Sequence, residues 1–143
     1  TTGELTEELA EIGAQLMVGT LIDIEMLHPL EQDDAEATYA EKIDKAEARI
    51  DWNRPAPELV RHVHGLSPFP GAWCEVDGQR VKLLRAELAE GSGAPGEVLD
   101  DRLCIACREG AIRPIGLQRA GKPKMDLDTF LRGNAVAKGM VLG

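Results

Sequence analysis

Aromatic side chains and long apolar runs are both scarce in this 143-residue sequence. Phe, Trp and Tyr make up 3% of the residues, so a hydrophobic core must consist mainly of Val, Leu, Ile and Ala. No apolar run approaches the roughly 18 residues of a membrane helix, and no basic-then-apolar leader opens the chain. The sequence therefore predicts no membrane-spanning helix, and it offers few aromatic platforms on which nucleic-acid bases could stack.

Cysteine is also rare, with one residue at position 74 and a single CxxC pair at Cys104 and Cys107. An odd number of cysteines without a secretory leader indicates a reducing compartment, so we expect a cytoplasmic protein. The pair is either half of a zinc or redox site or a set of small residues that fill a strand. Positions three apart on a strand point to opposite faces, and no suitably spaced second ligand pair follows, so we expect no metal.

Positive charge is scarce in the first third of the chain. Residues 1–47 contain thirteen acidic side chains against only Lys42 and Lys45, whereas residues 48–143 contain twelve acidic and fourteen basic side chains. The net charge of −9 therefore comes from the N-terminal third. Since local clusters set the field that a polyanion meets, the overall charge does not exclude an RNA-binding surface in the remainder.

An amphipathic helix is predicted over residues 3–24. Thr1 and Glu4 have the spacing of a capping box, and one face carries the apolar residues Leu5, Leu9, Ile12, Leu16 and Met17. We expect this stripe to pack on another part of a longer protein, on the chain's own domain or on a second copy, and otherwise the helix should fray. Residues 28–38 are acidic and lack apolar periodicity, which is typical of a surface linker.

A short helix and a stiff corner follow the linker. Pro55 and Pro57 suit a helix entry, and Gly65 its end. The residues that form its predicted apolar face are Leu59, Val60, Val63 and Leu66. Residues 67–71 contain two prolines, which deny backbone donors and prevent the helix from continuing.

Short strands dominate the rest of the sequence. Asp77-Gly78 is a strong hairpin signal between strands predicted at 72–76 and 79–88. Further strands are predicted at 97–99, 102–107, 111–117 and 140–142, with Pro114 marking an edge or a bulge. Asp126 can cap a helix over 127–132, with Gly133 just after it. This pattern predicts an α+β, mainly β fold: a small β-barrel with short helices, preceded by a linker and one amphipathic helix.

Three blocks of sequence resemble the methionyl-tRNA formyltransferase family. They are TYAEKIDKAEARIDWNRPAPELVRHVHGLSPFPGAW at residues 38–73, GAPGEVLDDRLCIACREGAIR at 93–113 and MDLDTFLRG at 125–133. The resemblance implies that residues 1–27 are the terminal helix of a truncated, Rossmann-like formyltransferase domain. It implies a linker at 28–53 and a C-terminal, OB-like β-barrel domain at 54–143. We accordingly expect this chain to be a fragment of a longer protein.

The family's activity gives a set of functional expectations. Members transfer formyl from 10-formyltetrahydrofolate to the methionine on initiator tRNA, as a step of translation initiation. Their catalytic Asn, His and Asp precede the region that this chain matches, so we assign no catalytic, cofactor-binding or metal residue here. His28, His62 and His64 do not replace them. The fragment should thus be non-catalytic and contribute tRNA docking beside the N-terminal catalytic domain of the same chain.

Basic residues supply the candidate tRNA contacts. Two on the long predicted strand, Arg80 and Lys82, share one face because they are two positions apart. The full candidate set is Lys42, Lys45, Arg49, Arg80, Lys82, Arg85, Arg119, Lys122 and Lys124. The alternative is that these are ordinary solvated charges, with Arg49 pairing with Asp51. Trp52 and Trp73 are expected to anchor the linker on the barrel, with base stacking on Trp73 as the other option.

Two further functions remain open at this point. Other folate-dependent formyltransferases, which act on nucleotide sugars or hydrolyse the formyl-folate, have a related C-terminal domain. The barrel is otherwise a structural lid on its catalytic partner, with no role in RNA binding. Self-association through Leu5, Leu9, Ile12 and Leu16 is a separate expectation.

Overall fold

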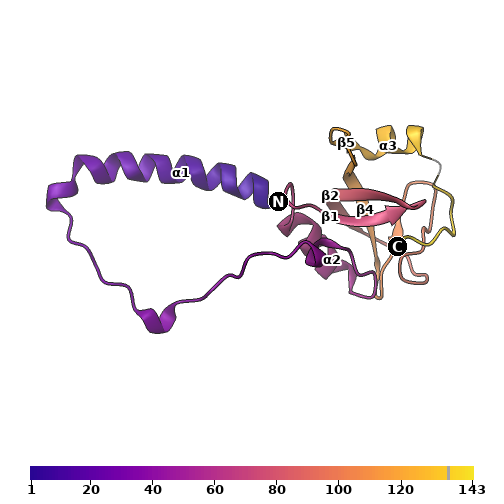
Figure 1. Ribbon diagram of the computed structural model, residues 1–143, viewed down its shortest axis with the longest axis horizontal. Coiled ribbons are helices and arrows are strands. Elements are labelled where there is room, and N and C mark those ends of the chain that lie inside the picture. The colour runs from indigo at the N-terminus through magenta and orange to yellow at the C-terminus, as the bar shows by residue number, and fades with distance from the viewer. Residues whose placement is uncertain (135) are drawn as a thin grey trace.

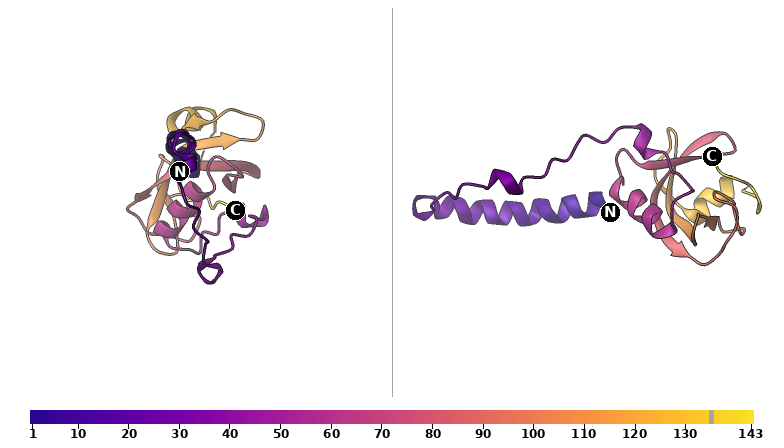
Figure 2. Two further views of the ribbon diagram at one scale, coloured as in Figure 1. Left: turned by 90° about the vertical axis from the view of Figure 1, so that its left-hand side faces the viewer. Right: turned by 90° about the horizontal axis from the view of Figure 1, so that it is seen from below.

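A long helix projects from an antiparallel sheet domain in the computed structural model, which describes residues 1–134 and 136–143 (Figure 1). Helix α1 (Thr2–Ile22) forms the arm, and the chain then returns to the domain as an extended segment. Three 3₁₀ turns interrupt this segment, at Ile24–Met26, Asp34–Glu36 and Ala46–Ala48. The view from below shows α1 and the returning segment extending from the same side of the domain (Figure 2).

The predicted capping box starts α1. The Thr1 hydroxyl accepts from the Glu4 backbone N–H, and the Glu4 carboxylate accepts from the Thr1 ammonium at 2.7 Å. The apolar stripe does not pack on the sheet, because Leu5, Leu9, Ile12 and Leu16 are between 46% and 66% exposed. The helix is nevertheless continuous to Ile22, so the predicted fraying is not seen.

Five antiparallel strands form the sheet. Their bounds are β1 (Ala72–Val76), β2 (Gln79–Ala89), β3 (Ile105–Ala106), β4 (Ala111–Arg119) and β5 (Met125–Asp126). The order is β1-β2-β4-β3, and β5 pairs with β4 beside β3. The predicted hairpin is confirmed, since Val76 pairs with Gln79 across Asp77 and Gly78. Both turn residues have positive φ, at 49° and 69°, as a two-residue turn of the I′ type requires.

The sheet is open, so the predicted OB-like barrel is not confirmed. Among the described residues no pairing joins β1 to β3 or β5. The strands predicted at 97–99 and 140–142 reduce to single bridges, Glu97 with Val141 and Val98 with Ile105. The strand predicted at 102–107 shortens to β3, and the pairing of β5 with β4 was not predicted.

Pro114 lies in the middle of β4, which has partners on both sides. On the side that faces β2, Pro114 pairs with Ala86. The register shifts at the next pair, Arg85 with Gly116, so Ile115 has no partner in β2. On its other side β4 pairs with β3 at Ile112 and with β5 at Gly116. Pro114 therefore falls between two short partner strands, where its missing N–H costs no ladder bond. The predicted bulge is present, whereas an edge strand is not.

Two short helices and the end of the linker complete the core. Helix α2 (Ala56–Gly65) packs Leu59 and Val63 against β2 and β4, and both side chains are fully buried. Helix α3 (Leu127–Gly133) is capped by Asp126, which accepts from the Thr129 N–H at 2.7 Å. The residues of the returning segment that enter the core are Ala48, Ile50 and Trp52. Burial of the Trp52 ring confirms its predicted anchoring role.

No described helix is both long and apolar enough to cross a membrane.

Candidate functional site

Five of the nine candidate basic side chains line one groove of about 460 Å³. They come from three segments: the turn before Ala48, strand β2, and the end of β4 with the loop after it. These five residues, which we call the groove cations, are Lys45, Arg80, Lys82, Arg119 and Lys122. The fold thus gathers on one surface charges that are far apart in the sequence.

Strand pairing sets the positions of the groove cations. Arg80 and Lys82 lie two apart on β2 and therefore share a face, as the sequence predicted. Register with β4 pairs Lys82 with Gln118 on this face and Arg119 with Val81 on the other, so Arg119 joins the groove lining from the end of β4. The Arg119 guanidinium donates to the Gln79 side-chain carbonyl at 2.7 Å. The Gln118 amide donates to the Lys122 carbonyl at 3.0 Å, which holds the loop that presents the Lys122 side chain.

Trp73 orients two arginines at the side of the groove. The Arg80 guanidinium carbon lies 4.0 Å from the centroid of the Trp73 ring, and that of Arg49 lies 5.5 Å from it. Such stacking is a cation–π contact. The Ile50 N–H donates to the Trp73 backbone carbonyl at 2.8 Å, so the backbone of β1 also fixes the end of the returning segment. Trp73 is half-buried and covered by Arg80, which supports the anchoring role over base stacking.

Arg49 is not paired with Asp51, the alternative that the sequence left open. The Asp51 carboxylate accepts from the side-chain amide and the backbone N–H of Asn53, both at 3.0 Å. These two hydrogen bonds lower the pKa of Asp51, and the charge of Arg54 adds a smaller effect. Arg49 remains exposed beside Trp73, with its charge available to a ligand.

The groove is a site of unbalanced positive charge. Its described lining contains no Asp or Glu, and no groove cation takes part in an ion pair within residues 1–134 and 136–143. Some arginines elsewhere on the domain are paired with carboxylates, as Arg102 is with Asp128 at 2.9 Å and Arg113 with Asp100 at 2.6 Å. The groove therefore offers an approaching anion several cations that have no ion-pair partner in the described part of the chain.

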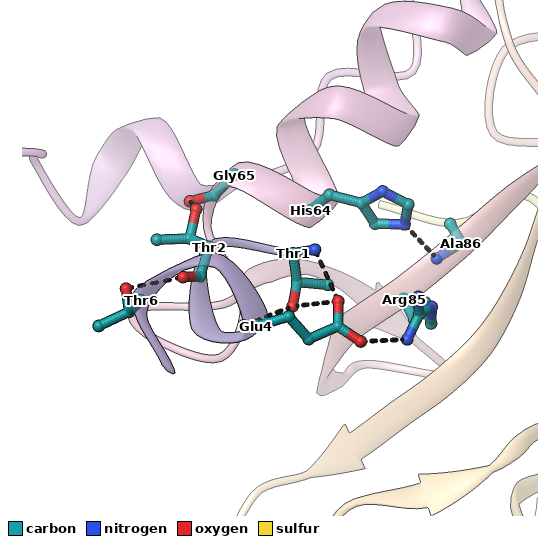
Figure 3. A network of polar contacts seen from close by, with 8 residues as sticks. All are labelled: Thr1, Thr2, Glu4, Thr6, His64, Gly65, Arg85 and Ala86. Atoms are coloured by element: carbon teal, nitrogen blue, oxygen red, sulfur yellow. Dashed lines mark hydrogen bonds and ion pairs between the residues drawn. The ribbon is translucent and has the colours of Figure 1, made fainter. Parts of the chain in front are cut away.

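The other candidates lie outside the groove lining. Arg85 donates to the Glu4 carboxylate at 2.7 Å and thereby ties β2 to α1 (Figure 3). The Thr1 ammonium and hydroxyl, together with the Arg85 guanidinium, lower the pKa of Glu4 to about 2. The Lys124 side chain passes close to Gly116, next to Arg85. Lys42 is exposed in the returning segment.

Sequence reasoning missed the six groove residues that are not basic: Ala48, Phe69, Pro70, Gln118, Ala120 and Gly121. Residues 67–71 were interpreted only as a stiff corner, although they place one of the few aromatic side chains between two prolines. That placement was the available signal for Phe69. Gln118 gave no signal, because its position depends on the pairing of β2 with β4.

His62, His64 and the three cysteines are partly or fully buried within the domain. The His64 Nε2 accepts from the Ala86 N–H at 3.3 Å (Figure 3), while burial lowers the pKa of His62, helped by the charge of Arg54. All three thiols are buried, and burial raises the pKa of Cys74 to about 12 and that of Cys107 to about 11. No group of three or more His, Cys, Asp or Glu suited to a metal occurs in the described part of the chain.

The described groove lining offers the ring of a folate donor no carboxylate, and its acceptors are the Gln118 side-chain carbonyl and backbone carbonyls, which are not specific for an aminopyrimidine edge. We therefore assign no residue of this chain to the donor.

Comparison with known proteins gives one family. Residues 42–135 match the family described as formyl transferase, C-terminal domain. The chain is 58% identical to a methionyl-tRNA formyltransferase of Ruegeria pomeroyi, over 97% of this chain and 46% of that protein. It is 55% identical to a methionyl-tRNA formyltransferase of Rhodopseudomonas palustris (strain BisB5), over 99% of this chain and 48% of that protein. The chain thus spans about half the length of these relatives.

Solved structures agree with this comparison. HypX from Aquifex aeolicus, crystallised in complex with tetrahydrofolic acid, is 28% identical with a TM-score of 0.65. The match covers 82% of this chain and 22% of HypX. A variant of the same protein matches with a TM-score of 0.67 over 87% of this chain and 24% of the variant.

Proposed function

This chain belongs to the family of formyl transferase C-terminal domains, and from this we propose that it is the tRNA-docking part of a methionyl-tRNA formyltransferase. The whole enzyme transfers formyl from 10-formyltetrahydrofolate to the methionine on initiator tRNA, in the cytoplasm. The observation that carries the docking role is the groove, where five Lys and Arg side chains converge without a described carboxylate. The names of the relatives favour a tRNA substrate over a nucleotide sugar.

Within this proposal the groove cations contact RNA phosphates. A folded RNA is recognised largely through its backbone and shape, which suits a cluster of cations rather than a set of base-specific contacts. Arg49 and Lys42 extend the contact surface along the returning segment. Arg85 forms an ion pair with Glu4 and serves to position α1. Lys124 lies near Gly116, outside the groove lining.

The division of the chain is part of the same proposal. Residues 1–27 are the end of a catalytic domain, residues 28–53 are a linker and residues 54–143 are the docking domain. Packing of Ala48, Ile50 and Trp52 in the core supports a linker whose last residues are fixed to the docking domain. The rest of the catalytic domain covers the stripe Leu5, Leu9, Ile12 and Leu16. No finding supports self-association through that stripe.

A chimaera tests this function. The C-terminal half of the Ruegeria pomeroyi relative is replaced by this chain, and formylation of methionyl-tRNA is measured with 10-formyltetrahydrofolate as donor. We expect the chimaera to formylate, the relative's N-terminal half alone to lose most of its rate, and this chain alone to form no product. A folded chimaera that neither binds initiator tRNA nor formylates it would contradict the proposal.

A further inference from the structure

We propose that the groove holds a single unstacked nucleotide of an RNA strand, with its base against the ring of Phe69 and its phosphates at the groove cations. This inference rests on the proposed RNA-docking function and deepens it, because phosphate contacts alone would need no aromatic residue. It assigns to Phe69 a stacking role that the basic residues cannot supply.

Phe69 is the aromatic side chain that the groove presents to solvent. It is 81% exposed, whereas Trp73 beside it is half-buried and covered by Arg80. Pro68 and Pro70 flank it and restrict the backbone, so little conformational freedom is lost when a ligand contacts the ring. Removing the surface of a large apolar ring from water lowers the free energy. A flat aromatic partner stacked on the ring removes the most surface.

The rest of the groove is complementary to a nucleotide. Small neutral residues, Ala48, Ala120 and Gly121, line it together with Pro70, and cations line its remaining sides. Its volume of about 460 Å³ lies within the range of pockets that take small organic ligands. A nucleotide combines a flat aromatic base with an anionic phosphate, so one ligand satisfies both parts of the lining.

The same geometry favours an unpaired nucleotide over a duplex. Bases in a helix are stacked on each other, and their faces are closed to a side chain such as Phe69. Proteins that bind single strands combine a cationic groove with aromatic residues on which bases stack. Contacts to RNA bases are mostly made at single-stranded loops, bulges and ends, where unstacked bases can be splayed out onto aromatic side chains.

The test compares Phe69→Ala and Phe69→Trp with Leu88→Ala, a control at an exposed apolar residue of β2 that does not line the groove. Binding of the 143-residue chain is measured to a single-stranded 12-mer of mixed sequence, to a blunt RNA duplex and to a nucleoside monophosphate. Circular dichroism checks that each variant is folded. Salt dependence is recorded for every variant, because a stacking residue changes affinity without changing the number of phosphate contacts.

We expect Phe69→Ala to weaken single-strand binding by about 5- to 100-fold, the loss typical of one base–aromatic stack, with the salt slope unchanged. Phe69→Trp should retain affinity and lose indole fluorescence on binding, and Leu88→Ala should bind as the parent chain does. Equal single-strand affinity of Phe69→Ala and the parent would overturn the inference. An equal effect of the substitution on duplex and single-strand binding would also overturn it. So would tight binding of the nucleoside monophosphate without binding of the single strand, which would assign the groove to a free nucleotide.

If the proposed RNA-docking function itself is wrong, the experiment gives a different result. The parent chain then binds neither the single strand, the duplex nor the nucleoside monophosphate, even at low salt. If instead the remainder of a longer protein covers Phe69, Phe69→Ala lowers the thermal stability of the chimaera and leaves its RNA affinity unchanged, which also overturns the stacking role.

Discussion

Glu4 and Arg85 join helix α1 to strand β2 through an ion pair of 2.7 Å. Two hydrogen bonds to backbone carbonyls accompany it. The Thr2 side-chain hydroxyl donates to the Gly65 carbonyl at 2.7 Å, and the Gly3 N–H donates to the Ser67 carbonyl at 3.0 Å. The first turn of α1 is therefore fixed to the corner that carries Phe69.

Breaking the ion pair should loosen α1 without affecting RNA binding. Arg85→Gln removes the charge partner of Glu4, and the amides of the first helical turn should then exchange with solvent faster. Arg102→Gln, which breaks an exposed pair with Asp128, is the matched control and should leave these amides unchanged. Hydrogen exchange read by mass spectrometry gives the first result, and the affinity for initiator tRNA gives the second. A large loss of tRNA affinity in Arg85→Gln would place that residue among the RNA contacts instead.

Gly3 provides a steric test of the same attachment. A Cβ at this position would lie 2.7 Å from the Cδ atom of Pro68, too close without a shift of the corner. Gly3→Ala should consequently detach the first turn of α1, despite the better helix propensity of Ala. Gly13→Ala is the control, because nothing lies within 4 Å of its Cβ, and it should stabilise the helix by roughly 0.5–1 kcal/mol. Faster exchange in both variants, or in neither, would contradict this account.

His62 should make the domain less stable in acid. Burial and the nearby Arg54 lower its pKa, so below the ordinary value of 6.5 the unfolded chain takes up a proton that the folded chain does not. The free energy of unfolding must then fall as pH decreases below 6.5. His62→Gln should reduce that fall, and His28→Gln in the exposed segment controls for loss of an imidazole. Thermal midpoints between pH 7.5 and 5 measure the effect, and identical pH profiles for His62→Gln and the parent would refute it.

The buried thiols should be chemically inert. Because burial raises the pKa values of Cys74, Cys104 and Cys107, almost no thiolate is present at neutral pH. Labelling with maleimide at pH 7 should be slow in the folded chain and complete in denaturant. Rapid labelling of Cys104 and Cys107 in the folded state, or their protection by zinc, would revive the redox or metal interpretation of the CxxC pair.

Local signals in the sequence predicted the elements that local chemistry determines. The capping box of Thr1 and Glu4, the Asp77-Gly78 turn and the Asp126 cap depend on neighbours within four residues, and all three are present. Strand β5 was not predicted, since a two-residue pairing has no periodicity to detect. The sheet is open because the segments predicted as strands at 97–99 and 140–142 make only single bridges, and such a reduction depends on tertiary pairing that residue patterns do not reveal.

The groove was only partly predictable for the same reason. Arg80 and Lys82 were placed on one face by the alternation of a strand, but Lys45 and Lys122 join them only through tertiary packing. Arg85 was a further candidate from the sequence, on the same strand as Arg80 and Lys82. In the structure the register shifts on both sides of Arg85, and its guanidinium pairs with Glu4, neither of which local patterns predict.

The most direct measurement of the docking role is the salt dependence of initiator-tRNA binding by the chain and two double variants. Arg80→Gln with Lys122→Gln removes two groove cations, whereas Arg102→Gln with Arg113→Gln removes two arginines that are paired with carboxylates. With five phosphate contacts, the logarithm of the affinity should fall with the logarithm of salt at a slope of about −3.5 to −4.5. The groove variant should reduce the magnitude of that slope by about 1.4–1.8 and the control should not. Equal slopes for the two double variants, or no binding by the parent chain at low salt, would contradict the account.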